Sequence, residues 1–129
     1  MLNRLGLVLH IIIETPAAIS FLLPVEGQLP GASTEAKLIM QNLGGALLTT
    51  NVVSAIFVLR SDFDDLSRLV ALALATYHVW PLRRAYVRLT GGTAANKVQR
   101  KTLGGPQVHL FVHTLCFAAL VLTGISSSR

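Results

Sequence analysis

The fold of this chain is decided by its first apolar run, LGLVLHIIIETPAAISFLLP, which occupies residues 5–24. About twenty mostly apolar residues are what an α-helix needs to cross the hydrocarbon core of a bilayer. Glu14 lies near the middle of the run, and His10 precedes it by one helical turn. A carboxylate at that depth costs several kcal/mol unless it is protonated, paired or facing water. The run therefore predicts a membrane helix that presents a polar site to the inside of the protein.

The composition of the whole chain supports a membrane protein. Of its 129 residues, 52% are hydrophobic and only 13% are charged, whereas a soluble domain usually carries about a quarter charged residues. The length allows about four spans with short connections. We expect an all-α, integral membrane four-helix bundle, a single transmembrane domain over residues 1–129, with helices at 5–23, 34–59, 64–89 and 106–123. In a eukaryotic cell we expect it in the endoplasmic reticulum.

The net charge of +5 does not indicate a nucleic-acid partner. The basic residues gather next to apolar runs, where topology signals and lipid headgroup contacts are expected. They are mainly Arg83, Arg84, Arg88, Lys97, Arg100 and Lys101. We therefore expect contact with membrane lipids and no binding of nucleic acid.

Polar residues from several helices are predicted to lie at related depths. With about 1.5 Å of rise per residue and a core about 30 Å thick, Glu14, His78 and His113 fall in one layer although they belong to three helices. His10 and Asn51 fall farther toward the opposite face and form a second polar level. This agreement in depth favours a site in the interior of the bundle.

The chemistry of these residue types favours proton transfer. A carboxyl group beside imidazoles in a low-dielectric interior can donate and accept protons near neutral pH. We expect Glu14 to be the principal acid/base group, with His10, His78 and His113 as catalytic partners. The substrate would be a lipophilic terpenoid, sterol or polyketide-like molecule, and the reaction a cyclisation, an isomerisation or an epoxide opening. The expected substrate contacts are Asn51, Gln41, Tyr77, Trp80 and Phe117.

The same residue types also ligate metals. The pair His78 and His113 suits haem, and the histidines together with Glu14 suit zinc or iron. Only one such pair exists, and His10 is predicted to lie too far along the bundle to join His109, so we expect neither a metal nor another cofactor. Cys116 is the only cysteine. It excludes an intrachain disulfide and a zinc site of paired cysteines, and we expect it to be a small packing residue.

Two other function classes remain open at this stage. In a non-catalytic membrane adaptor that holds other enzymes together, Glu14 and Asn51 would only join helices. A proton-coupled carrier is disfavoured by the small size and by the lack of an internal repeat. Small residues permit close helix contact, which makes a second copy of the chain or another membrane enzyme a candidate partner. They include Gly44, Gly45, Ala71 and Ala75.

Two resemblances agree with the enzyme class. The stretch His10-Ile-Ile-Ile-Glu14 resembles the His-x-x-x-Glu element of the emopamil-binding sterol isomerases and their relatives, which protonate and deprotonate a carbocation in a membrane cavity. That likeness implies such a role for His10 and Glu14, but it covers five residues, and the chain lacks the further acidic residue and the cavity tryptophan at matching places. The whole-chain pattern also resembles small uncharacterised four-helix membrane proteins, many of them fungal. Some of these occur among genes for terpenoid or polyketide tailoring.

Overall fold

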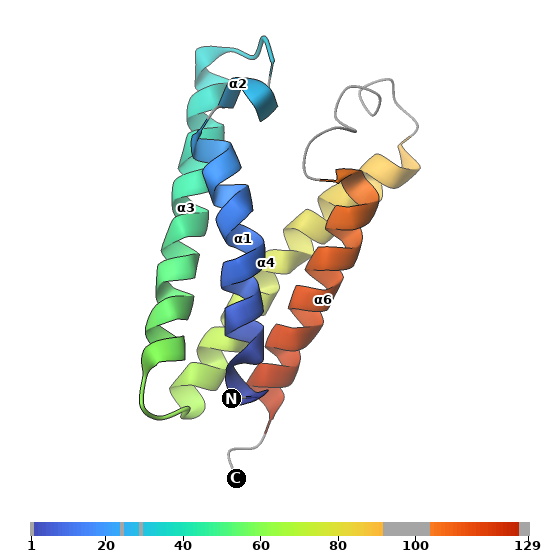
Figure 1. The fold of residues 1–129 in the computed structure, drawn as a ribbon. Coiled ribbons are helices and arrows are strands. Elements are labelled where there is room, and N and C mark those ends of the chain that lie inside the picture. The colour runs from blue at the N-terminus through green and yellow to red at the C-terminus, as the bar shows by residue number, and fades with distance from the viewer. Residues whose placement is uncertain (1, 24, 29, 92–103, 127–129) are drawn as a thin grey trace.

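The computed structural model describes residues 2–23, 25–28, 30–91 and 104–126. A 3-10 turn at Leu2–Arg4 leads into four long helices, with the single-turn helix α2 between the first two. Their bounds are α1 Leu5–Leu22, α2 Val25–Gln28, α3 Thr34–Leu59, α4 Asp65–Thr90 and α6 Gly105–Ile125 (Figure 1). The described residues contain no strand. The prediction of an all-α four-helix bundle is confirmed, and the ends of the long helices lie within two residues of the predicted ends.

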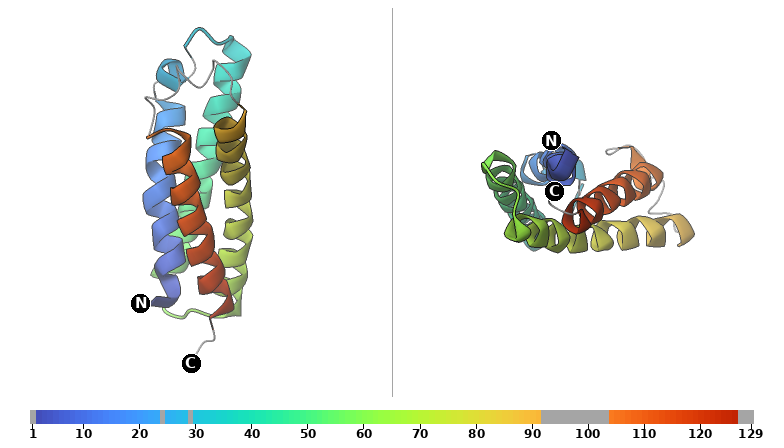
Figure 2. Two further views of the ribbon diagram at one scale, coloured as in Figure 1. Left: turned by 90° about the vertical axis from the view of Figure 1, so that its right-hand side faces the viewer. Right: turned by 90° about the horizontal axis from the view of Figure 1, so that it is seen from below.

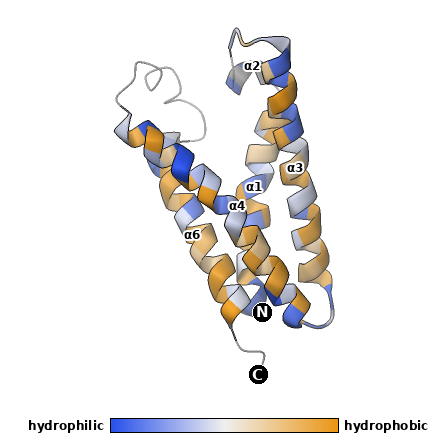
Figure 3. Cartoon of the chain, turned by 180° about the vertical axis from the view of Figure 1, so that it is seen from behind, coloured by the Kyte–Doolittle hydropathy of each residue, from blue (hydrophilic) through white to orange (hydrophobic). Residues whose placement is uncertain are grey.

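Three of the described helices, α1, α3 and α6, are long and apolar enough to cross a membrane. They carry large apolar side chains on their outer surface, among them Ile12, Ile39 and Leu122, each more than half exposed. Figure 3 shows apolar stretches along α3 and α6. Such continuous apolar surface suits contact with lipid. The fourth long helix, α4, is richer in charged residues and is not among these three candidate spans. Three of the helices that the structure describes thus have the length and composition of a span, which supports a membrane protein.

The long helices associate as two pairs. Helix α1 packs against α3, α4 packs along α6, and the two pairs meet through the contact of α1 with α6. Helices α3 and α4 are joined by a short turn but make few contacts with each other, and they diverge away from that turn (Figures 1 and 2). The start of α1 and the end of α6 lie at the same end of the bundle (Figure 1).

Local signals set where the helices begin. The side chain of Ser33 accepts the amide N–H of Ala36 at 3.3 Å before α3, and the side chain of Asp64 accepts the amide N–H of Ser67 at 2.9 Å before α4. Both are N-caps, which satisfy amides that have no partner in the first turn of a helix. Gly104 precedes α6 with a φ of +82°, a left-handed conformation that favours glycine.

Two apolar clusters enclose a polar layer. The larger cluster contains Leu7, Ala71, Leu74, Ala75, Cys116 and Leu120, and the smaller one contains Ala18, Phe21 and Leu47. On α1, His10 and Glu14 lie between the residues of the two clusters, and both are fully buried. The expected packing role of Cys116 is confirmed.

The small residues proposed for contact with a partner are mostly used within the chain. Ala71 and Ala75 are buried in the larger cluster, and Gly44 is buried where α3 meets α1. An added side chain at Gly45, in contrast, would meet nothing within 4 Å. Of the four, Gly45 is the one that an external partner can reach.

Candidate functional site

The structure brings the four predicted catalytic residues together. His10 and Glu14 come from α1, His78 comes from α4 and His113 comes from α6. The first three are fully buried and His113 is 7% exposed. The site therefore lies where the two helix pairs meet, with residues supplied by both.

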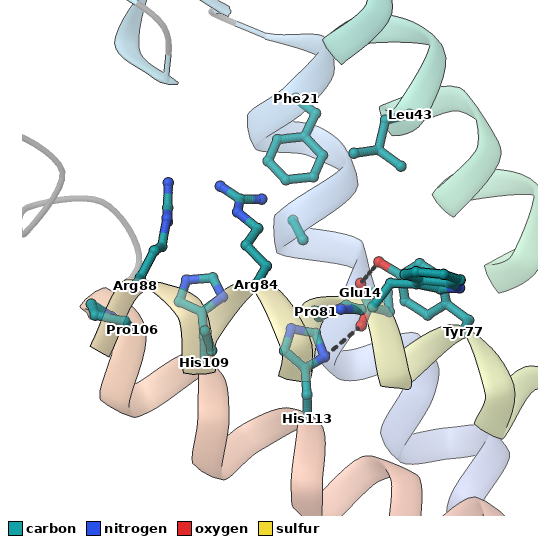
Figure 4. Close-up of a pocket in the computed structure, with 13 residues that line it drawn as sticks. Glu14, Phe21, Leu43, Tyr77, Pro81, Arg84, Arg88, Pro106, His109 and His113 are labelled. Atoms are coloured by element: carbon teal, nitrogen blue, oxygen red, sulfur yellow. Dashed lines mark hydrogen bonds and ion pairs between the residues drawn. The ribbon is translucent and has the colours of Figure 1, made fainter. Parts of the chain in front are cut away.

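One oxygen and two nitrogen atoms converge at its centre. Glu14 Oε1 lies 3.4 Å from His113 Nδ1 and 3.6 Å from His78 Nδ1, and the two Nδ1 atoms lie 3.0 Å apart. Hydrogen bonds of this kind are usually 2.7–3.2 Å long. The two nitrogens can therefore share a hydrogen bond. Oε1 is close to both but, among the residues that the structure describes, has no hydrogen-bond partner although it is buried. The other oxygen, Oε2, accepts a long hydrogen bond of 3.4 Å from the hydroxyl of Tyr77 (Figure 4).

A chain of hydrogen bonds sets the tautomers of the histidines. The hydroxyl of Thr50 donates to the carbonyl of Leu47 at 2.8 Å, so its oxygen accepts from His10 Nε2, which lies 3.1 Å away. With one proton on each ring, His10 Nδ1 is then an acceptor for His78 Nε2, at 3.0 Å. His78 therefore turns the lone pair of its Nδ1 toward Glu14 and His113.

The arrangement differs from the predicted two levels in one respect. His10 belongs to the same network as His78, rather than to a separate level with Asn51. The amide nitrogen of Asn51 donates instead to the hydroxyl of Thr15 at 3.0 Å, which joins α3 to α1. Its Oδ1 is buried and has no hydrogen-bond partner within the described part of the chain. The predicted layer of Glu14, His78 and His113 is confirmed by the distances between their side chains.

Beside the network is a cavity of about 160 Å³ that is lined mainly by α1, α4 and α6, with Leu43 from α3. Glu14 and His113 line it, together with Tyr77 and mostly apolar side chains (Figure 4). Trp80 also lines the cavity, and its side chain is 66% exposed. The cavity therefore reaches the outside of the bundle along α4. Arg84 and Arg88 also border it and supply positive charge. A second cavity of about 200 Å³ lies between α1 and α6, and His113 borders both.

The predicted substrate contacts divide into two groups. Tyr77 and Trp80 line the first cavity as expected. Gln41 does not, because it is exposed on the outside of α3. Phe117 packs against the larger apolar cluster, and Asn51 lies at the α1–α3 contact, so neither lines the described cavities.

Sequence reasoning missed two contributors. Thr50 was not considered, although it precedes Asn51 and carries a hydroxyl in an apolar helix. Arg84 was predicted only as a topology signal or a lipid headgroup contact. Its spacing of four residues from both Trp80 and Arg88 puts the three on one face of a helix, which is a signal that the sequence does contain. Of the other basic residues of that prediction, Arg83 is exposed on α4, and Lys97, Arg100 and Lys101 lie outside the described residues.

The comparisons with known proteins do not test the likeness to the emopamil-binding isomerases, which stays a prediction. No protein-family model, curated protein or solved structure matches this chain.

Proposed function

We propose that this chain is a small integral membrane enzyme that performs acid/base chemistry on a lipophilic substrate. One observation carries the proposal. The carboxylate of Glu14 is fully buried, has an oxygen without a hydrogen bond, lies beside two imidazoles and borders a cavity that reaches the outside of the bundle. A buried and unsatisfied carboxylate is costly in a bilayer protein, so its place beside a cavity supports a functional role.

Glu14 is the group that exchanges a proton with the substrate. Its Oε1 faces His78 and His113. These imidazoles can return a proton to Glu14 after it has given one to the substrate, or accept a proton that Glu14 has taken up. The hydrogen bond from His78 to His10 extends this path along α1. The hydroxyl of Tyr77 donates a long hydrogen bond to the other oxygen of the carboxylate.

The cavity supports a substrate with a long apolar part. It is too small for a whole sterol or terpenoid, whose hydrocarbon would extend past Trp80 along the outer surface of the bundle. The positive charge of Arg84 and Arg88 favours an oxygen-rich or anionic end on the same molecule. A terpenoid, sterol or polyketide-like compound in the endoplasmic reticulum membrane of a eukaryote meets these requirements.

Three reaction types suit this site. Isomerisation of a double bond adds a proton at one carbon and removes one from a neighbouring carbon. Cyclisation started by protonation also ends with the loss of a proton, and epoxide opening adds one molecule of water. None of them needs an electron donor or acceptor, and each uses one group that can both give and take a proton.

The test is the lipophilic content of the purified protein. The full chain is isolated in mild detergent and its extract is analysed by mass spectrometry, for the wild type and for Glu14→Gln. We expect a discrete lipophilic compound whose identity or amount changes in the variant, because glutamine keeps the shape of the side chain but cannot exchange a proton.

Glu26→Gln is the matched control, since it makes the same chemical change in the single-turn helix α2, at a glutamate that lines neither described cavity. It should leave the extract unchanged. Bulk phospholipid alone in all three preparations would contradict the proposal and would favour the adaptor.

A further inference from the structure

The strongest unexplained feature of the site is the spacing of the oxygen and the two nitrogen atoms at its centre. Glu14 Oε1, His78 Nδ1 and His113 Nδ1 form a triangle with sides of 3.4, 3.0 and 3.6 Å. We propose that Glu14, His78 and His113 bind a divalent transition-metal cation of the zinc class, with a fourth coordination position open to the cavity. The cavity and Glu14 are those of the proposed function, but binding of the cation does not depend on that function.

The distances fit such an ion. A triangle with sides of 3.0, 3.4 and 3.6 Å has its corners about 1.9 Å from its centre. An ion slightly outside this plane reaches all three atoms at roughly 2.0–2.1 Å, the usual distance from zinc to nitrogen and oxygen ligands. Tetrahedral ligands at that distance lie about 3.4 Å apart, close to the observed sides. Two histidines, one carboxylate and one open position are also a common ligand set of catalytic metal sites.

The surroundings prepare the ligands for a cation. The chain from Thr50 through His10 holds the proton of His78 on Nε2, so His78 Nδ1 presents a lone pair to the centre. Histidines that bind metals typically donate their other ring N–H in this way. Tyr77 donates to the outer oxygen of Glu14 and leaves Oε1 directed inward. His113 needs only to carry its single ring proton on Nε2 instead of Nδ1.

The cation also resolves the one unsatisfied atom of the cluster. Within the described residues, hydrogen bonds alone leave Glu14 Oε1 buried and without a partner. A divalent cation bonded to this carboxylate and to a hydroxide in the fourth position has no net charge, which suits a low-dielectric interior. Glu14 and His113 border the cavity, so a molecule in the cavity reaches that fourth position.

A second group of possible ligands, His10, His78 and Cys116, is less suitable. It is the other group of described residues whose ligand atoms lie close enough together to hold an ion. However, neither His10 nor Cys116 borders the two cavities, so an ion there would have no open position. The cation is therefore assigned to the set that contains Glu14.

The proposal changes how the acid/base step would occur. With the cation bound, Glu14 is a ligand, and the group that exchanges protons with the substrate is a water molecule in the fourth position, whose pKa the cation lowers. The substrate class is unchanged. The two proposals thus differ in a measurable property, namely whether the folded protein contains a bound ion.

The test uses the full-length protein in detergent. After removal of adventitious metal, it is titrated with Zn²⁺ and with Co²⁺, with bound ions counted by elemental analysis. We expect one ion per chain, and visible Co²⁺ absorption bands of the intensity that four-coordinate sites give. His113→Gln and Glu14→Gln should lose both signals, while His109→Gln, one turn away on α6, should keep them. His10→Ala should weaken binding by about 10–100-fold, as loss of a ligand's hydrogen-bond partner does.

The outcomes separate the two proposals. Folded wild-type protein that binds no stoichiometric ion, or a loss in His109→Gln as large as in His113→Gln, overturns the metal site. If a lipophilic compound still changes in Glu14→Gln, the proposed function survives that failure. If the ion binds but no discrete compound is ever found, the metal site stands and the proposed function fails. Circular dichroism of each variant shows that a lost signal is not loss of fold.

Discussion

Adjacent glycines on α3 allow the contact between α1 and α3 to be tested with a matched pair of substitutions. A Cβ atom at Gly44 would lie 2.9 Å from Leu22 Cγ, 3.1 Å from the carbonyl oxygen of Ala18 and 3.1 Å from Phe21 Cβ. A Cβ atom at Gly45 would meet nothing within 4 Å. Gly44→Ala should therefore force the two helices apart, and Gly45→Ala should not.

The magnitude follows from which atoms can move. Leu22 can rotate its side chain, but the oxygen of Ala18 and the Cβ of Phe21 are fixed to α1, and carbon atoms in good contact lie about 3.5–4.0 Å apart. Helix α1 must shift by a few tenths of an ångström, and overpacking of this kind costs about 1–3 kcal/mol. Both variants gain the same helix propensity, about 1 kcal/mol, which cancels in the comparison. Gly44→Ala should thus be less stable than Gly45→Ala by about 1–3 kcal/mol.

The assay is unfolding of both variants in mixed micelles of increasing sodium dodecyl sulfate content, followed by circular dichroism. The difference between their unfolding free energies is the quantity to compare. Equal stabilities would refute the close contact of α1 with α3 at this point. Gly44→Ala should also reduce binding in the cavity, because Phe21 lines its wall.

Three further predictions concern single side chains. The hydroxyl and the amide of Ser67 donate to Asp64 and lower the pKa of its carboxyl, so this group stabilises the fold above its unfolded pKa and loses that contribution as the pH falls through the folded pKa. The melting temperature should therefore fall on the acid side, and it should fall less in the Asp64→Asn variant than in the wild type. Thr50→Val leaves a buried N–H of His10 without an acceptor, which should cost about 1–3 kcal/mol in unfolding free energy, whereas Thr50→Ser should stay near the wild type. Tyr77→Phe removes only a long hydrogen bond, so its stability should change by less than about 1 kcal/mol while the amount or identity of the bound lipophilic compound changes.

Counting along the helices predicted the depth of the site because the rise per residue of an α-helix is nearly constant. That rule placed Glu14, His78 and His113 in one layer without any knowledge of the helix arrangement. The helix ends were predictable from local sequence, because proline, glycine and short charged turns separate the apolar runs. Neither result required information about how the helices pack.

The errors concern rotation about the helix axes and the reach of side chains. Gln41 and Asn51 are ten residues apart, which at about 100° per residue leaves them about 80° apart around α3, so one faces outward when the other faces α1. Counting also treated His10 as a separate level, because it does not show that His78 uses its two ring nitrogens in opposite directions. Which helices are neighbours, and how they turn, depends on packing that a single sequence does not display.

The division of the bundle into two helix pairs has a thermodynamic consequence. Glu14 belongs to one pair, and His78 and His113 belong to the other, so any molecule or ion that contacts all three is linked to the association of the pairs. A ligand that binds only the associated form stabilises it by about 2.7 kcal/mol when present at a hundred times its dissociation constant. The melting temperature of the bundle is therefore itself a reporter of occupancy, and cations and lipophilic compounds can be ranked by it before any reaction has been identified.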